Sequence, residues 1–260
     1  MIPTFTFATV ATGDTCVAHV LHRILWTWMN LLQFCISNQT SSVAEDVLNK
    51  PWRPLPARRL SLRVARTIRW VLVPASLALS SRFDGYALPS SAALVIATLA
   101  HNELELGAHW LTRNLLNATG YAAFNLGAMS ISCSDSTSEM RSLLLIQWCN
   151  SAVIFTTIHA QDFKDVAGDR QIGRRTMPIA HPRVSRLIMA GLLPAWSIGL
   201  AWYWRLAFDL STLFVIFGTY VGLRFAVGRT TTEDMHSYRY YNIWLCLLHA
   251  VPFLGSRKVG

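Results

Sequence analysis

Eight apolar segments follow one another along this 260-residue chain, each about as long as a helix that crosses a lipid bilayer. Only 14% of the residues are charged, whereas soluble domains average about a quarter. A soluble all-helical protein with a large core is the alternative, but eight such segments in succession argue against it. The segments are residues 16–37, 62–81, 86–106, 114–131, 141–160, 185–204, 209–227 and 239–255. The sequence therefore predicts an all-α, multi-spanning transmembrane helix bundle that forms one integral-membrane domain over residues 1–260.

The net charge of +9 is concentrated in two basic runs. These runs are Lys50, Arg53, Arg58, Arg59, Arg63, Arg66 and Arg69, then Lys164, Arg170, Arg174, Arg175, Arg183 and Arg186. Nucleic-acid binding can explain basic runs, but in a membrane protein the positive-inside rule already places them on the cytoplasmic face. Four apolar segments separate the runs, and an even number of crossings returns a chain to the same side. We therefore expect no nucleic-acid partner and a multi-pass protein of the endoplasmic reticulum, with both basic loops in the cytosol.

A polar motif follows the first apolar segment, from Asn38 to Arg58. If the preceding helix continues through its start, Asn38, Ser42 and Asp46 lie four residues apart and share one helical face. An amide, a hydroxyl and a carboxylate are oxygen ligands of the kind that Mg²⁺ prefers, and Mg²⁺ is typically shared with substrate phosphates. The alternative is an ordinary polar helix end at the membrane interface.

A second polar motif follows the fifth apolar segment. Asp162, Asp165 and Asp169 fall at positions i, i+3 and i+7, where one helical face would crowd three negative charges unless a cation neutralises them. A solvated charged face is the alternative. Because the motif directly follows an apolar segment, where unpaired carboxylates are costly, the metal-site interpretation is favoured.

Basic residues complete the chemistry of the two motifs. A diphosphate requires cationic donors, and the planar guanidinium of Arg can hold two phosphate oxygens at once. The candidate diphosphate-binding residues are Lys50, Arg53, Lys164, Arg170 and Arg174. The candidate catalytic residues and ligands for Mg²⁺ are Asn38, Ser42, Asp46, Asp162, Asp165 and Asp169.

These motifs resemble those of the UbiA superfamily of intramembrane prenyltransferases, from about residue 16 to the end of the chain. The family's first motif, NDxxDxxxD followed by Lys/Arg-Pro-x-Arg-Pro, matches at Asn38, Asp46 and residues 50–54. Its second motif, DxxxD, matches at Asp165 and Asp169. The resemblance implies a nine-helix fold, so we expect about eight helices here, with a shortened or divergent first helix.

The first motif departs from the family pattern in an informative way. Gln39 and Ser42 stand where the family has aspartates, and the resulting Asn38, Ser42, Asp46 spacing is similar to the Asn/Ser/Glu triad of class I terpene cyclases. The stretch resembles the fungal terpene-cyclase branch of the superfamily. This resemblance implies Mg²⁺-dependent ionisation of farnesyl or geranylgeranyl diphosphate, with farnesyl diphosphate favoured, and closure of a cyclic terpene in secondary metabolism.

Two other functions stay open: an aromatic prenyltransferase of meroterpenoid biosynthesis, and a non-enzymatic transporter or prenyl-binding protein. For an enzyme, aromatic side chains inside the bundle would shield the allyl cation from water. The candidate lining residues are Trp26, Phe34, Trp110, Tyr121, Phe124, Trp148 and Phe155. Polar residues on the motif side that could hold a base are Asn102, Glu103, Glu105, His109, Arg113, Asn114 and Asn117, with Tyr238, Tyr240 and Tyr241 as weaker candidates.

Overall fold

The structure is a computed structural model that describes residues 8–10, 12–131 and 137–255. In these residues every regular element is a helix, and no strand occurs. The predicted all-α class is therefore confirmed. Each of the eight predicted apolar segments coincides with a long helix, with ends that differ by a few residues.

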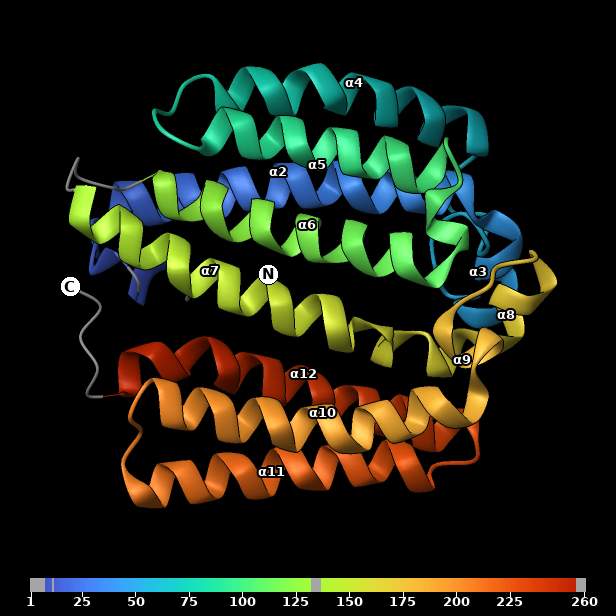
Figure 1. Cartoon of the computed structure of the whole chain (residues 1–260). Helices are drawn as coiled ribbons and strands as arrows, with labels where there is room; N and C mark the ends of the chain where they lie inside the picture. The colour runs from blue at the N-terminus through green and yellow to red at the C-terminus, as the bar shows by residue number, and fades with distance from the viewer. Residues whose placement is uncertain (1–7, 11, 132–136, 256–260) are drawn as a thin grey trace. The chain divides into compact units, whose positions relative to one another are not determined.

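The chain divides into two compact units, and each is described by itself. The first unit comprises residues 1–136 and 167–174, and the second comprises residues 137–166 and 175–260. The first unit holds α2 (Val17–Ser41), α3 (Val43–Asn49), α4 (Leu62–Ser80), α5 (Ala87–Asn102), the 3₁₀-helix η1 (Leu106–Ala108), α6 (Trp110–Ser130) and most of α8 (Val166–Gln171) (Figure 1).

The second unit holds the remaining helices. They are α7 (Thr137–Thr157), the 3₁₀-helices η2 (Ile158–Gln161) and η3 (Phe163–Asp165), α9 (Met177–Ala180), α10 (Pro182–Tyr203), α11 (Phe208–Val227) and α12 (Thr231–Leu254). The helices α10 and α11 pack closely at Gly222, because this residue has no side chain. A Cβ atom there would lie 2.9 Å from the Met189 carbonyl oxygen of α10. That the whole chain forms one domain stays a prediction.

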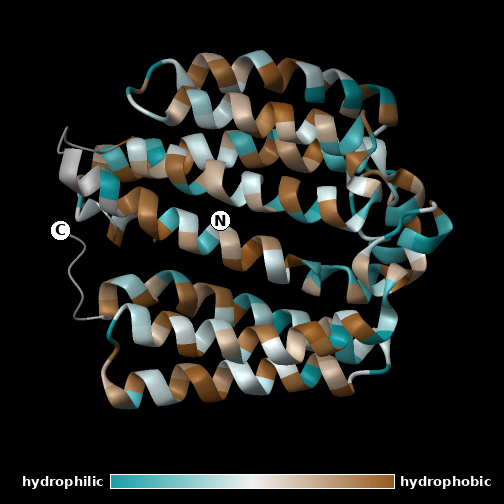
Figure 2. Cartoon of the chain, viewed as in Figure 1, coloured by the Kyte–Doolittle hydropathy of each residue, from teal (hydrophilic) through white to brown (hydrophobic). Residues whose placement is uncertain are grey.

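Three stretches of the described chain are long and apolar enough to cross a membrane: Leu143–Gln171, Pro182–Tyr203 and Phe208–Val227. Figure 2 shows hydrophobic residues recurring along α10 and α11. The other predicted spans do not reach this level, for different reasons. In α2 the buried face is polar and includes Arg23, Asn30 and Gln33, whereas α5 has only 16 residues.

Buried hydrogen bonds fix α2, the helix that carries the first motif. The Trp26 indole N–H donates to Ser80 Oγ of α4 at 2.8 Å, and Ser91 Oγ of α5 donates to Asn30 Oδ1 at 2.9 Å. Ser80 and Ser91 are themselves hydrogen-bonded. A satisfied polar network of this kind specifies one arrangement of helices where apolar packing alone is less selective.

The premise that one continuous helix runs through the first motif is wrong. Helix α2 ends at Ser41, and Ser42 departs from helical geometry with φ −126° and ψ 39° before α3 begins. The Ser42 N–H still donates to the Asn38 carbonyl, and the Asp46 N–H donates to the Ser42 carbonyl. The chain is therefore kinked at Ser42 rather than interrupted. Serine side chains compete with helical hydrogen bonding, so this residue type favours helix ends.

The single helical face predicted for the second motif is also wrong. Asp162 lies between the 3₁₀-helices η2 and η3, Asp165 ends η3, and Asp169 lies in α8. A 3₁₀-helix has about three residues per turn, so it does not continue the 3.6-residue spacing on which the prediction rested. Asp169 belongs to the first unit, whereas Asp162 and Asp165 belong to the second.

Gly168 brings α8 against α3 within the first unit. A Cβ atom at this position would lie 2.7 Å from Asn49 Cγ, well inside van der Waals contact. The absence of a side chain at Gly168 therefore lets the segment that carries Asp169 approach the segment that carries Asp46.

We expect Gly168→Ala to destabilise the purified protein by about 1–3 kcal/mol, the usual cost of overpacking. Thermal unfolding in detergent measures this. Gly191→Ala in α10 is the matched control, because nothing lies within 4 Å of the added Cβ. In a double-mutant cycle, Gly168→Ala should cost much less in the Asn49→Ala background. An equal cost in both backgrounds would contradict the proposed contact.

Candidate active site

The guanidinium of Arg174 joins the two motifs within the first unit. Its Nη2 donates to Ser42 Oγ at 2.9 Å, and its Nη1 donates to Asp169 Oδ1 at 3.0 Å and to Glu45 Oε2. Ser42 and Glu45 come from the first motif, and Asp169 comes from the second. Within the first unit, these contacts bring the first motif together with the part of the second motif that carries Asp169. That both motifs share one face of a membrane, as the parity argument predicted, stays a prediction.

The carboxylates of this cluster are buried. The exposed fraction is 5% for Glu45, 1% for Asp46 and 0% for Asp169. A buried charge is costly unless it is paired and hydrogen-bonded. Arg53 Nη1 donates to both oxygens of Asp46, at 2.8 and 2.9 Å, and Lys50 Nζ donates to Glu45 Oε1 at 3.4 Å. Three of the predicted diphosphate-binding residues therefore pair with motif carboxylates: Lys50, Arg53 and Arg174.

Glu45 is held in its ionised form by its surroundings. Burial raises the pKa of its carboxyl, but the positive charges of Arg174, Lys50 and Arg113 outweigh burial and hold that pKa below its ordinary value. Sequence reasoning gave Glu45 no role, because the family pattern places the aspartate one residue later, at Asp46.

The amide of Asn38 is fixed by the end of α5. Asn102 Nδ2 donates to Asn38 Oδ1 at 2.9 Å, and Asn102 Oδ1 lies 2.9 Å from Nδ1 of His101. The imidazole of His101 packs against Gly107, where a Cβ would collide with the ring. Asn102, one of the polar residues predicted on the motif side, thus orients a predicted metal ligand.

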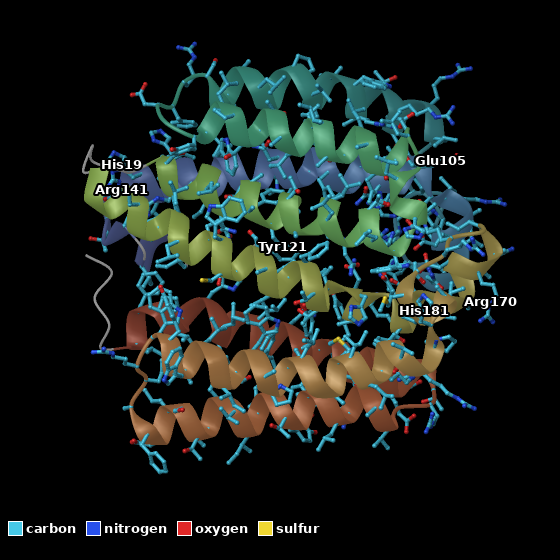
Figure 3. All side chains as sticks on the ribbon, viewed as in Figure 1. His19, Glu105, Tyr121, Arg141, Arg170 and His181 are labelled. Atoms are coloured by element: carbon cyan, nitrogen blue, oxygen red, sulfur yellow. The ribbon has the colours of Figure 1, made fainter. Side chains whose placement is uncertain are left out.

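Two other polar residues predicted on the motif side have different surroundings. Glu103 Oε1 accepts a hydrogen bond from Arg69 Nη2 at 2.5 Å and forms an ion pair with it. Arg69 is itself buried, so this ion pair is partly shielded from water. Glu105 is exposed in a left-handed conformation on the connection between α5 and α6 (Figure 3).

The remaining predicted site residues lie elsewhere. In the second unit, Asp162 and Asp165 are buried, and Lys164 Nζ donates to Asp165 Oδ2 at 2.6 Å. The same ammonium lies 5.0 Å from the ring centroid of Tyr238, in cation–π geometry. Arg170 is exposed on α8 in the first unit (Figure 3).

The oxygen atoms of the first-unit cluster suit a divalent cation. Ser42, Glu45, Asp46 and Asp169 offer a hydroxyl and three carboxylates, which are hard ligands of the kind Mg²⁺ takes. Asp169 Oδ2 is buried without a hydrogen-bond partner among the described residues. The donor types fit Mg²⁺, but in the described part of the chain no three His, Cys, Asp or Glu side chains converge as a metal site. In this structure Lys50, Arg53 and Arg174 pair with the carboxylates instead.

An apolar cavity of about 190 Å³ lies between α2 and α6 in the first unit. Its lining residues are Thr27, Leu31, Phe34, Leu116, Asn117, Gly120, Tyr121 and Phe124. Three predicted lining residues are among them: Phe34, Tyr121 and Phe124. Thr27, Leu31 and Phe34 continue at helical spacing to Asn38 on the same face of α2. The cavity therefore follows the face that leads to the first motif.

Aromatic contacts stiffen the wall of this cavity. The ring of Phe124 packs edge-on against Phe34, at 6.5 Å between centroids, and against the buried Trp26, at 6.4 Å. Trp148 was also predicted to line a cavity, but its side chain is 75% exposed, as expected of a surface residue.

Known proteins are similar to this chain over most of its length. The chain is 29% identical to the fumagillin beta-trans-bergamotene synthase of Aspergillus fumigatus, over 96% of this chain and 86% of that one. It is 31% identical to a polyprenyl transferase of Hericium erinaceus, over 93% and 83%. A UbiA homolog from Archaeoglobus fulgidus, solved with DMAPP and Mg²⁺, has the same fold, with a TM-score of 0.69, 14% identity and coverage of 97% and 94%.

The family model gives the same result over most of the chain. The model of the UbiA prenyltransferase family matches residues 1–245. The chain therefore belongs to the UbiA prenyltransferase family.

Proposed function

We propose that this enzyme is a Mg²⁺-dependent membrane terpene cyclase, which ionises a prenyl diphosphate, farnesyl diphosphate above all, and closes the cation into a cyclic terpene. The relatives support an enzyme that acts on prenyl diphosphates. The observation that carries the proposal is the Arg174 cluster, in which oxygens of both motifs and three basic side chains gather in one buried place.

The basic residues of the cluster would bind the diphosphate. Arg53 and Arg174 present guanidinium N–H groups, and Lys50 presents an ammonium, to oxygens that phosphate oxygens can replace. Asn38, Ser42, Asp46 and Asp169 would hold Mg²⁺. Asp162 and Asp165 are proposed as further ligands because the second motif resembles an aspartate-rich metal-binding motif. Bound Mg²⁺ supplies positive charge that stabilises the departing pyrophosphate. Lys164 and Arg170 are proposed as further contacts to the diphosphate.

The cavity beside α2 would receive the first part of the prenyl chain. Its aromatic faces, from Phe34, Tyr121 and Phe124, would exclude water and stabilise the allyl cation by about 0.5–2 kcal/mol for each cation–π contact. At about 190 Å³ the cavity is small beside the roughly 300–1,000 Å³ of typical ligand pockets. The walls would therefore have to adjust as the chain enters and folds.

The fate of the cation separates the two candidate reactions. In a cyclase the nucleophile is a double bond of the same prenyl chain, whereas in a transferase it is a second molecule. Gln39 and Ser42 remove two carboxylates from the first motif and favour the cyclase. An aromatic prenyltransferase is the second candidate, because a polyprenyl transferase is as similar to this chain as a terpene synthase is.

The proposed location follows from charge and hydropathy. The apolar helices and the family support an integral membrane protein. We propose that the membrane is the endoplasmic reticulum, and the positive-inside rule supports a cytosolic position of the motif loops.

The reaction is tested with membranes that contain the full chain, Mg²⁺, and either farnesyl or geranylgeranyl diphosphate, without an acceptor. We expect release of pyrophosphate and a cyclic terpene hydrocarbon in the organic extract, measured by gas chromatography and mass spectrometry. Product that forms only after a phenolic acceptor is added would identify a transferase. No turnover of either diphosphate, with or without an acceptor, would favour a non-enzymatic membrane protein.

The site assignment is tested by Asp46→Asn and Asp169→Asn. Each removes the charge of a proposed metal ligand with little change of shape, so pyrophosphate release should fall below detection. Asp84→Asn is the control, because Asp84 is an exposed aspartate on the connection between α4 and α5. Wild-type turnover in either motif variant would show that its carboxylate is not needed.

The cavity wall is tested by Phe124→Leu. Loss of an aromatic face should change the ratio of terpene products while pyrophosphate release continues, because ionisation takes place at the motifs. Phe208→Leu is the matched control, since Phe208 is 86% exposed at the start of α11. An unchanged product ratio in Phe124→Leu would mean that this cavity does not hold the reacting chain.

A further inference from the structure

We propose that Glu45 is a further metal-facing carboxylate of this site, which substitutes for the carboxylates absent at positions 39 and 42. The inference rests on the proposed function and adds a ligand that the family motif does not contain. The motif pattern has no acidic position at Glu45, and its nearest aspartate is Asp46.

One carboxylate oxygen of Glu45 contacts the second motif, whereas the other accepts from Lys50 of the first motif. Glu45 and Asp169 both accept from the same nitrogen, Nη1 of Arg174, and Ser42 Oγ accepts from the other terminal nitrogen. Oxygens from both motifs therefore surround a single positive group. A divalent cation in that place would meet a hydroxyl and two carboxylates, a set of oxygen ligands suited to Mg²⁺.

A second observation points to a ligand at the same place. Asp169 is fully buried, and in the part of the chain that the structure describes its Oδ2 has no hydrogen-bond partner, although Oδ1 contacts Arg174. An unpaired buried carboxylate oxygen costs free energy, and binding of a cation would recover it. This oxygen belongs to the carboxylate that shares Arg174 with Glu45.

Asp46 is engaged differently. Both of its oxygens accept from Nη1 of Arg53, which is seven residues away in the same motif. Oε2 of Glu45 instead accepts from Arg174, which is 129 residues away in the second motif. Of these two neighbouring carboxylates in the first motif, Glu45 is thus the one that meets the second motif directly.

Glu45 could alternatively be a structural counter-ion of Arg174. A counter-ion would act on a metal only indirectly, as an outer-shell partner that contributes about 10- to 100-fold to affinity, so a larger loss of metal binding separates the two roles. Mn²⁺ is a suitable probe, because its binding to the purified full-length protein in detergent is measured directly by electron paramagnetic resonance, without turnover.

We expect Glu45→Gln to weaken Mn²⁺ binding by more than the roughly 10- to 100-fold that outer-shell partners of metal sites contribute, and a loss within that range would support the counter-ion role. Glu45→Asp keeps the charge but shortens the reach, so its affinity should be intermediate, and this variant also serves if Glu45→Gln does not fold. Glu233→Gln is the matched control, because Glu233 is an exposed capping-box residue of α12, where Gln also functions.

Wild-type Mn²⁺ affinity in both Glu45 variants, with weakened binding in Asp169→Asn, would overturn the inference. Absence of Mn²⁺ binding in the wild-type protein would overturn it too. These results are distinguishable from failure of the proposed function, which is measured as pyrophosphate release by the wild-type protein. An enzyme that cyclises its substrate but binds Mn²⁺ without Glu45 refutes only the inference.

Discussion

The arrangement of the site depends on one guanidinium. Glu45 and Asp169 are buried carboxylates that would repel each other, and the positive charge of Arg174 between them makes their burial tolerable. The same group reaches Ser42, 132 residues earlier in the chain. Its contacts therefore hold the end of α2, the short helix α3 and the residues around α8 in one cluster. Gly168, which leaves room for Asn49, permits the close approach that these contacts require.

Both motifs lie where regular helix gives way. The kink at Ser42 turns α3 away from the axis of α2, and the 3₁₀-helices η2 and η3 end the regular geometry of α7. A straight helix would distribute polar side chains along one stripe, whereas a kink gathers Ser42 and Glu45 around one point. Deviations of this kind are common at functional sites, because they direct side chains that regular geometry cannot bring together.

The sequence was sufficient for the parts of the structure that follow from composition and spacing. Apolar length predicted the eight long helices. Charge parity predicted that the motifs share one face of a membrane, and contact between Ser42 and Arg174 is compatible with that prediction. The assumption of ideal helices failed at Ser42 and between Asp162 and Asp169, because local backbone breaks depend on tertiary partners. The role of Glu45 could not be read from a pattern, since its importance comes from Arg174 in the folded protein. The polar face of α2 likewise reflects partners on α4 and α5 rather than lipid.

We propose that Arg174 holds the oxygen cluster together without substrate and contacts the diphosphate instead when substrate and Mg²⁺ bind. The most direct test is an experimental structure of the full chain with Mg²⁺ and an unreactive farnesyl diphosphate analogue. We expect the guanidinium of Arg174 on diphosphate oxygens, and the carboxylates of Glu45 and Asp169 turned toward Mg²⁺. A complex in which Arg174 still bridges Ser42, Glu45 and Asp169 while the diphosphate binds elsewhere would contradict this account.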